Sequence, residues 1–302
     1  MSAPTHPTNG HAEGPTASHT DGAAVPTRAD ATVLVQLTDL HIGAPGTHPY
    51  GTDTAANLRV VAHAVRESGL EPDAVLLTGD LSDRGDAASY ELLRELVRDE
   101  LEPLGAPVLP VVGNHDHRGT FRQAYLGEAD GRDDDPYHYV CDLDRVRIVM
   151  CDSYLAGQVT GELGAAQLAW LDDQLASAGD RATIVALHHP SVPRGVPRPA
   201  DYLLEDRAAL GEVLERHDVA AVLCGHAHVS AVSHFGNTMH AVAPATAYQL
   251  DPTRGGGAAR AYDACGYSVC TVRDGRAIVN AVRVEPTGSV LYEREAVVAG
   301  TR

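Results

Sequence analysis

The sequence lacks several features that would each decide the class of protein. No segment of its 302 residues approaches the ~20 consecutive apolar residues of a membrane-spanning helix, so we expect no membrane association. The five cysteines are an odd number and include no Cys-x-x-Cys pair, which predicts reduced thiols. The N-terminus shows neither an apolar export core nor a twin-arginine pair. These absences together predict a cytoplasmic protein.

Basic residues are also scarce. Lys and Arg number 23 against 41 Asp and Glu, which gives a formal net charge of −18. Duplex nucleic acid and anionic membranes are both bound through basic side chains, so we expect neither as a partner. A small phosphate-containing substrate is still compatible with this charge, because metal ions can dominate the electrostatics of a site.

The hydrophobic pattern predicts one domain after a terminal segment. Residues 1–30 are rich in Pro, Thr, Gly, Ala and His without apolar periodicity, and we expect them to be disordered. Residues 31–302 should form the domain, and its first strands and helices alternate in a βαβαβ order that implies a parallel sheet. Short strands between residues 229 and 284 predict an antiparallel second sheet. The strands are expected at residues 32–37, 74–77, 108–112, 145–151, 183–187, 219–223, 229–234, 238–242, 267–272 and 277–284, and the helices at 55–66, 87–97, 165–175 and 207–214.

Five short clusters of Asp, Asn and His each follow an apolar run. They are Asp39-Leu40-His41, Gly79-Asp80 continuing to Asp83-Arg84-Gly85, Gly113-Asn114-His115-Asp116, His188-His189-Pro190 and Gly225-His226-Ala227-His228. Open α/β sheets place their active sites beyond the carboxyl ends of strands, where these clusters lie.

The spacing within the clusters favours metal binding. In an extended segment, the pairs Asp39/His41 and His226/His228 each direct both side chains to one face, where they can reach one ion together. The donors are imidazoles, carboxylates and one amide, without thiolate. This set suits Mn, Fe, Zn or Co and does not choose among them. The clusters therefore predict a two-metal site of the kind that transfers phosphoryl groups.

The order of the motifs resembles the calcineurin-like metallophosphoesterase superfamily over residues 33–284. Finer features are similar to bacterial class III cyclic-nucleotide phosphodiesterases: Tyr50-Gly51-Thr52-Asp53, Gly161-Glu162-Leu163 followed by Gln167-Leu168-Ala169-Trp170-Leu171, Leu187-His188-His189-Pro190, and Asp206-Arg207-Ala208-Ala209-Leu210. The resemblance implies an α/β fold, a four-layer αββα sandwich of two mixed β-sheets flanked by helices.

The resemblance also implies a role for each cluster residue. One metal ion would be held by Asp39, His41, Asp80 and His228, and a second by Asp80, Asn114, His188 and His226. His189 is the alternative to its neighbour His188. The ions would be divalent or trivalent Mn, Fe or Zn, and a hydroxide bridging them would attack phosphorus in line with the leaving oxygen. His115 and Asp83 would be catalytic. His115 would protonate the leaving group, and the Asp83 carboxylate would orient His115. Asn114, His115 and His226 would contact the substrate.

The resemblance leaves the substrate open. Small phosphodiesters are expected, with cyclic nucleotides of the cAMP type as the leading class. Glycerophosphodiesters, other phosphodiesters and phosphomonoesters are alternatives on the same core, because fold alone does not settle the substrate. A non-catalytic scaffold is the remote alternative, since all expected ligands and His115 are present. Related proteins imply a homodimer.

Two local features depart from the family pattern. His117 stands where an acidic residue is expected, and residues 153–160 carry Tyr154, Leu155 and Gln158 where some relatives carry histidines. A shift in substrate preference is the expected consequence. His117, His138, His234 and His240 are expected to be exposed or hydrogen-bonded without a role in the site.

Overall fold

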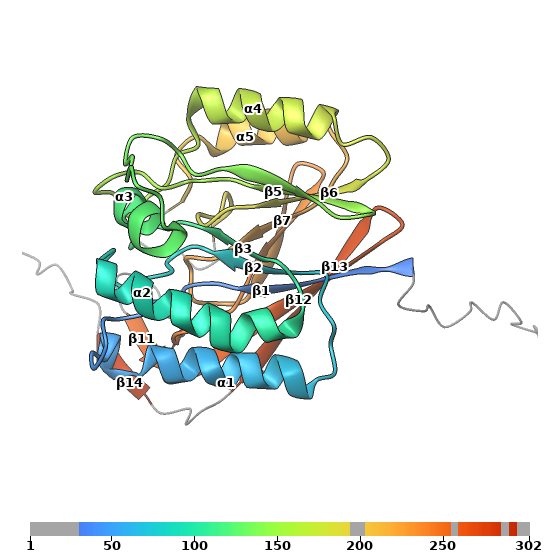
Figure 1. Cartoon of the computed structure of the whole chain (residues 1–302). Helices are drawn as coiled ribbons and strands as arrows, with labels where there is room; N and C mark the ends of the chain where they lie inside the picture. The colour runs from blue at the N-terminus through green and yellow to red at the C-terminus, as the bar shows by residue number, and fades with distance from the viewer. Residues whose placement is uncertain (1–29, 194–202, 255–258, 285–289, 295–302) are drawn as a thin grey trace, which may run out of the picture. The chain divides into compact units, whose positions relative to one another are not determined.

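The structure is a computed structural model that describes residues 30–193, 203–254, 259–284 and 290–294 (Figure 1). Residues 1–29 of the segment expected to be disordered lie outside the described residues. Every strand and helix expected from the hydrophobic pattern is present, with its ends shifted by at most three residues.

The first βαβαβ run forms one side of a mixed sheet. Within the part of the chain that the structure describes, this sheet has the strand order β13-β12-β1-β2-β3. The three N-terminal strands run parallel to one another, and β12 pairs antiparallel with β1. The strands are β1 (Thr32–Leu37), β2 (Ala74–Thr78), β3 (Val108–Val111), β12 (Cys265–Arg273) and β13 (Arg276–Val284).

The second large sheet has the order β4-β5-β6-β7-β9-β8 among the described residues. Its strands β5, β6, β7 and β9 are parallel, and β4 and β8 are antiparallel at the two edges. The strands are β4 (Tyr139–Asp142), β5 (Val146–Met150), β6 (Ala182–Ala186), β7 (Val219–Cys224), β8 (Ala231–Phe235) and β9 (Thr238–Val242). A small antiparallel sheet joins β10 (Gln249–Leu250), β11 (Ala259–Tyr262) and β14 (Val290–Arg294).

The expectation of a separate antiparallel sheet from residues 229–284 is wrong. Strands β8 and β9 extend the second sheet, and β12 and β13 complete the first. The physical reason is that each parallel run leaves an edge of unpaired backbone groups, which a C-terminal hairpin can satisfy. Strand β12 is buried on both faces from Cys265 to Cys270, as a strand inside a sheet requires.

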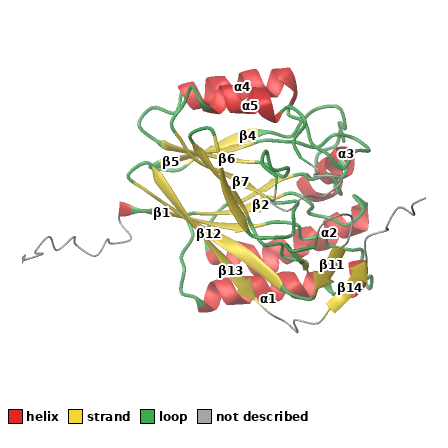
Figure 2. Cartoon of the chain, turned by 180° about the vertical axis from the view of Figure 1, so that it is seen from behind, coloured by secondary structure: helices red, strands yellow, loops and turns green. Residues whose placement is uncertain are grey.

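Helices cover the outer face of each large sheet (Figures 1 and 2). Side chains alternate along the strands, so that Leu34 of β1 packs between the two sheets while Val35 packs against the helices. The described part of residues 31–302 therefore has the four-layer αββα order, which confirms the expected fold class. The covering helices are α1 (Thr54–Glu67) and α2 (Ala87–Leu96) on the first sheet, and α4 (Gly164–Ala176) and α5 (Arg207–Leu214) on the second.

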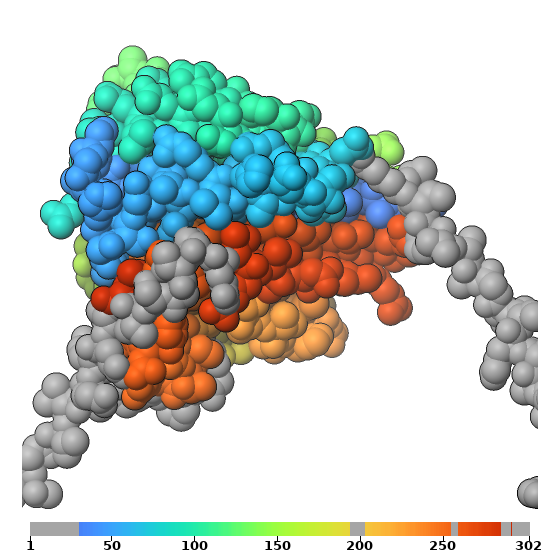
Figure 3. All heavy atoms as spheres, turned by 90° about the horizontal axis from the view of Figure 1, so that it is seen from below, coloured from blue at the N-terminus to red at the C-terminus, as the bar shows by residue number. Residues whose placement is uncertain are grey.

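Local sequence explains where these helices begin. Asp53 and Asp86 are the N-caps of α1 and α2, and each carboxylate accepts a hydrogen bond from the backbone NH three residues later. Seen from below, α1 lies between α2 and β13 (Figure 3). The remaining helical segments are short: η2 (Pro49–Gly51), η3 (Val97–Leu101), η4 (Glu102–Leu104), α3 (Arg118–Thr120) and η5 (Phe121–Leu126). Among the described residues, no helix combines the length and apolar character needed to cross a membrane.

Candidate metal centre

The five sequence clusters converge where the carboxyl ends of the parallel strands of both large sheets lie together. The structure brings together all seven residues expected to bind metal, although they follow five different strands. Asp39 and His41 follow β1, Asp80 follows β2, Asn114 follows β3, His188 follows β6, and His226 and His228 follow β7.

One group of ligand atoms surrounds His41 and His228. The Nε2 atoms of these two imidazoles lie 3.1 Å apart. Nε2 of His228 is 3.3 Å from Oδ1 of Asp39, and Nε2 of His41 is 3.5 Å from Oδ2 of Asp80. The three side chains Asp39, His41 and His228 place one ligand atom each within 4.8 Å of one another.

A second group surrounds His188. Its Nε2 lies 3.3 Å from Oδ2 of Asp80, 3.2 Å from Oδ1 of Asn114 and 3.3 Å from Nδ1 of His226. The same carboxylate oxygen of Asp80 therefore approaches both groups. This is the position that a bridging ligand would occupy.

The chemistry of this cluster fits cations. Asp39, His41, Asp80, His188 and His228 are each at most 5 % exposed, and their nitrogen and oxygen atoms point at one another. Facing imidazole lone pairs and buried carboxylates repel unless protons or positive ions lie between them. Imidazole and carboxylate are also donors that Mn, Fe and Zn accept.

The backbone is held in an uncommon conformation at most of these ligands. Among the described residues, seven non-glycine residues have positive φ, and five of them are Asp39, His41, Asp80, His226 and His228, with φ between 43° and 69°. Such conformations cost free energy and persist where the surrounding structure enforces them, which occurs most often at functional sites.

Main-chain carbonyls orient two of the imidazoles. Nδ1 of His188 donates to the carbonyl oxygen of Thr78 (2.8 Å), and Nδ1 of His228 donates to that of Tyr248 (2.9 Å). With the proton fixed on Nδ1, the lone pair of the neutral ring lies on Nε2, the atom that faces the cluster.

The charged groups shift one another's pKa values. Burial alone would raise the pKa of Asp80, but His188, together with His115 and His41, lowers it well below its usual value. Burial also opposes protonation of His188, yet Asp80 and Asp39 raise the pKa of this imidazole to about 9. Burial lowers the pKa of His226 well below its usual value. A cation binding at Nε2 of His188 would compete with its proton.

His115 lies beside the cluster, with its ring centroid 4.6 Å from that of His41. Its backbone NH donates to Oδ1 of Asp80 (2.8 Å), which ties its position to the proposed bridge. Burial would lower the pKa of His115, but Asp80 and the carbonyl of Asp83 raise it.

The expected contact between His115 and the Asp83 carboxylate is corrected by the structure. Nδ1 of His115 donates to the main-chain oxygen of Asp83 (2.9 Å), whereas the Asp83 carboxylate lies 3.4 Å from Nδ1 of His41. Asp83 thus orients His115 through its backbone and contacts a candidate ligand through its side chain.

The environment of His189 differs from that of His188. His189 is fully buried, its Nδ1 lies 2.8 Å from Oγ of Ser153, and its ring centroid lies 4.8 Å from that of His226. Burial lowers the pKa of His189 to about 3. A Cβ at Gly161 would overlap this ring, which explains the glycine in the Gly161-Glu162-Leu163 motif. His189 therefore packs against the candidate ligand His226, and one ligand atom each of His188, His189 and His226 lie within 4.8 Å of one another.

Two residues to which the sequence analysis assigned no role support the centre. The buried Asp116 carboxylate accepts hydrogen bonds from the NH groups of Leu81, Ser82 and Gly113 and from the hydroxyl groups of Ser82 and Tyr90. It thereby fixes the loop of Asp80 to the loop of Asn114. Tyr248 covers the cluster from another side, with its ring centroid 4.3 Å from that of His228.

His117 and His234 match the expectation of exposed or hydrogen-bonded histidines, whereas His138 and His240 do not. His234 is exposed, and Nδ1 of His117 accepts the hydrogen bond of the Thr120 NH at the start of α3. His138 is half-buried against Trp170, with Nδ1 unpartnered among the described residues. His240 is 2 % exposed, and neither ring nitrogen has a partner among the described residues. The His240 side chain is buried because of its position on β9, and the hydrophobic pattern of this strand did not predict that burial.

Comparison with known proteins identifies the family. The family model for calcineurin-like phosphoesterases matches residues 32–230. The chain belongs to the calcineurin-like phosphoesterase family. It is thus a metal-dependent phosphoesterase, which confirms the resemblance drawn from the motifs.

Relatives with curated names support the same placement. A cAMP/cGMP dual specificity phosphodiesterase of Mycobacterium tuberculosis is 39% identical over 232 residues, covering 76% of this chain and 72% of that protein. The glycerophosphodiester phosphodiesterase GpdQ of Enterobacter lignolyticus is 31% identical over 225 residues, covering 72% and 78%. A dimetal phosphatase from Danio rerio superposes with a TM-score of 0.62 at 17% identity, over 85% of this chain and 98% of that one, and shares the fold.

Proposed function

We propose that this phosphoesterase hydrolyses small phosphodiesters, with cyclic nucleotides of the cAMP type as its substrates. The observation that supports the substrate class is the 39% identity with a cAMP/cGMP dual specificity phosphodiesterase. The complete cluster of candidate ligands beside His115 supports a catalytic role over a scaffold role.

The ligand assignment is part of this proposal. Asp39, His41, Asp80 and His228 would hold one metal ion, and Asp80, Asn114, His188 and His226 would hold the other. The bound ions, as Mn, Fe or Zn, would supply an activated water and neutralise charge on the phosphoryl oxygens. The 3.3 Å and 3.5 Å approaches of Asp80 to His188 and His41 support its assignment as the shared ligand.

The partly exposed residues of the site would receive the substrate. Asn114, His115 and His226 are only partly buried, whereas the other candidate ligands are buried, so these three face the side from which a diester can approach. Because Nδ1 of His115 donates to the Asp83 carbonyl, Nε2 is the nitrogen that would give its proton to the leaving oxygen. Asn114 and His226 would contact the phosphoryl oxygens.

A glycerophosphodiester is the second candidate substrate, because the chain is 31% identical to a glycerophosphodiester phosphodiesterase. One experiment separates the candidates: kcat/KM with Mn²⁺ for cAMP, cGMP, 2′,3′-cyclic AMP, sn-glycero-3-phosphoethanolamine and p-nitrophenyl phosphate. The proposal requires the highest value for a cyclic nucleotide and loss of activity with a chelator. A preference for glycerophosphoethanolamine or for the monoester would refute the proposed substrate class.

We further propose a cytoplasmic location and a homodimer. All five cysteines are unpaired and four are buried, which supports a reducing compartment. Light scattering of the purified protein would test the dimer by its mass.

A further inference from the structure

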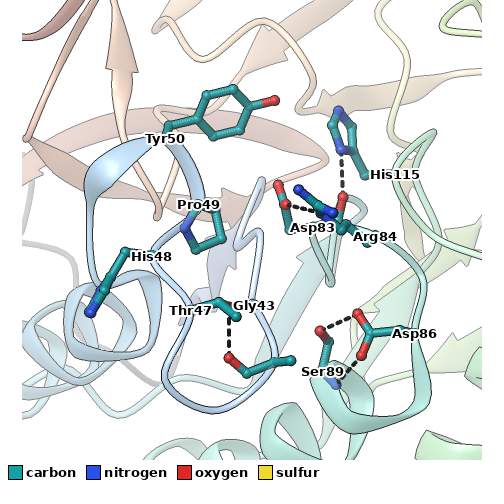
Figure 4. Close-up of a pocket in the computed structure, with 11 residues that line it drawn as sticks. Gly43, Thr47, His48, Pro49, Tyr50, Asp83, Arg84, Asp86, Ser89 and His115 are labelled. Atoms are coloured by element: carbon teal, nitrogen blue, oxygen red, sulfur yellow. Dashed lines mark hydrogen bonds and ion pairs between the residues drawn. The ribbon is translucent and has the colours of Figure 1, made fainter.

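A cavity of about 660 Å³ adjoins the candidate metal centre on the side of His115. Its walls are the segment after β1, from Gly43 to Tyr50, and the turn from Asp83 to Asp86 together with Ser89 in the first turn of α2 (Figure 4). The volume lies within the range of about 300–1,000 Å³ that is usual for small-molecule sites. Since His115 lines the cavity and also touches His41, a phosphate at the metals would have its organic substituent in this cavity.

An aromatic ring forms one wall of this cavity. The Tyr50 side chain is 44 % exposed, and its backbone has a φ of 54°, which is rare for an aromatic residue. Its ring centroid lies 4.7 Å from that of Tyr248, which in turn lies 4.3 Å from that of His228. The Tyr50 ring is therefore supported from the side of the metal centre. In Figure 4 it lies on the same side of the cavity as His115.

The charged groups of the cavity already have partners. The Asp83 carboxylate lies 3.4 Å from His41 and 3.6 Å from Nε of Arg84, and the Asp86 carboxylate accepts from the NH and hydroxyl groups of Ser89. A second phosphate in the cavity would meet both carboxylates, one guanidinium group and the imidazoles of His48 and His115. An uncharged substituent would avoid repulsion by the two carboxylates and would contact the apolar atoms of Ala44, Pro49 and Tyr50.

We propose that this cavity is the nucleoside subsite and that the base stacks on the ring of Tyr50. The inference rests on the proposed function, because it assigns the organic part of the same phosphodiester. Stacking on an aromatic ring tolerates any base, since every base presents a π-face. The subsite therefore selects a nucleoside over an aliphatic alcohol without distinguishing adenine from guanine.

Binding of phosphate ligands to the Mn²⁺-loaded full-length protein tests the subsite without turnover of a diester. Titration calorimetry would compare AMP, ribose 5-phosphate and inorganic phosphate in the wild type, Tyr50→Ala and the matched control Tyr50→Phe. We expect the wild type to bind AMP more tightly than ribose 5-phosphate. Tyr50→Ala should weaken AMP binding roughly tenfold, as for the loss of one base–aromatic stack, and Tyr50→Phe should retain it.

The affinity for inorganic phosphate separates stacking from support of the metal centre. It should be the same in all three proteins if Tyr50 contacts only the base. The proposal is overturned if AMP binds Tyr50→Ala as tightly as the wild type, or if AMP and inorganic phosphate weaken by equal factors. Failure of the wild type to hydrolyse cAMP would instead refute the proposed function, and that assay is independent of this titration.

Discussion

Replacing His240 by leucine should make the protein more resistant to acid. His240 lies on β9, is 2 % exposed, and has the ring of Phe235 at a centroid distance of 5.8 Å. Neither of its ring nitrogens has a partner among the described residues. Burial, with a smaller effect of His234, lowers the pKa of His240 to about 4 from a usual value of 6.5. The folded protein thus holds this imidazole neutral in a pH range where the unfolded chain protonates it.

The sign of the effect follows from proton binding. As the pH falls through 6.5, His240 becomes protonated in the unfolded state, whereas in the folded state it stays neutral down to about pH 4. The unfolded state therefore binds more protons in this range, and the free energy of unfolding decreases as the pH falls. With about 1.4 kcal/mol per pKa unit, His240 lowers the free energy of unfolding at pH 5.0 by about 2 kcal/mol. At pH 7.5 this contribution is close to zero. The leucine variant lacks it at both pH values.

Urea denaturation at pH 7.5 and pH 5.0 measures this difference. Both proteins would be kept in a chelator, so that loss of metal at low pH does not contribute. The stability advantage of His240→Leu over the wild type should grow by about 2 kcal/mol between the two pH values. His63→Leu, at an exposed histidine on α1, is the matched control and should follow the wild type. Parallel pH profiles of His240→Leu and the wild type would refute the reasoning.

Three further substitutions test the candidate centre. Asp80→Ala should abolish turnover and lower the metal content measured by mass spectrometry, and normal activity would contradict its bridging role. His115→Ala should retain the metals and slow turnover by roughly 100-fold, as for a lost general acid, whereas metal loss would show a different role. Gly161→Ala should destabilise the protein by about 1–3 kcal/mol, by overlap with His189, and lower its metal content. At Gly157 a Cβ would meet open space but the φ of 71° strains alanine, so Gly157→Ala should lose some stability and keep its metal content. Equal metal loss in both variants would contradict the explanation by overlap with His189.

The candidate ligands could be found from the sequence because of where they lie along it. Each cluster directly follows a buried strand, and the carboxyl ends of parallel strands lie at one edge of a sheet. The order Asp39, Asp80, Asn114, His188, His226 along the chain therefore predicts that these side chains converge at one edge of the sheets. The family pattern then supplied the assignment of individual roles.

The pairing of the C-terminal strands could not be deduced in the same way. Strands β8 and β12 both precede a tight turn and an antiparallel partner, yet they belong to different sheets. The alternation of apolar and polar residues along a strand predicts which of its faces is buried. The sheet that the strand joins depends instead on which sheet edge is still unpaired once the helices are packed. The wrong expectation for residues 229–284 arose from this.

Contacts that depend on side-chain rotamers could not be predicted from the sequence either. The Asp83 carboxylate turns to His41 and leaves its main-chain oxygen to His115, a choice that no spacing rule contains. The five donors of Asp116 come from three separate segments, which become neighbours only in the fold. Tyr248 lies outside every cluster and contacts the centre from the loop after β9.

The left-handed backbone at Asp39, His41, Asp80, His226 and His228 limits how this centre can change during evolution. Asp, Asn and His are the non-glycine residues that adopt this conformation most readily, while β-branched and bulky side chains resist it. Replacement ligands such as glutamate would have to tolerate a backbone that disfavours them. The backbone conformation of these loops therefore limits which residue types can serve as metal ligands. A change of metal ion during evolution would have to be achieved with Asp, Asn and His at these positions.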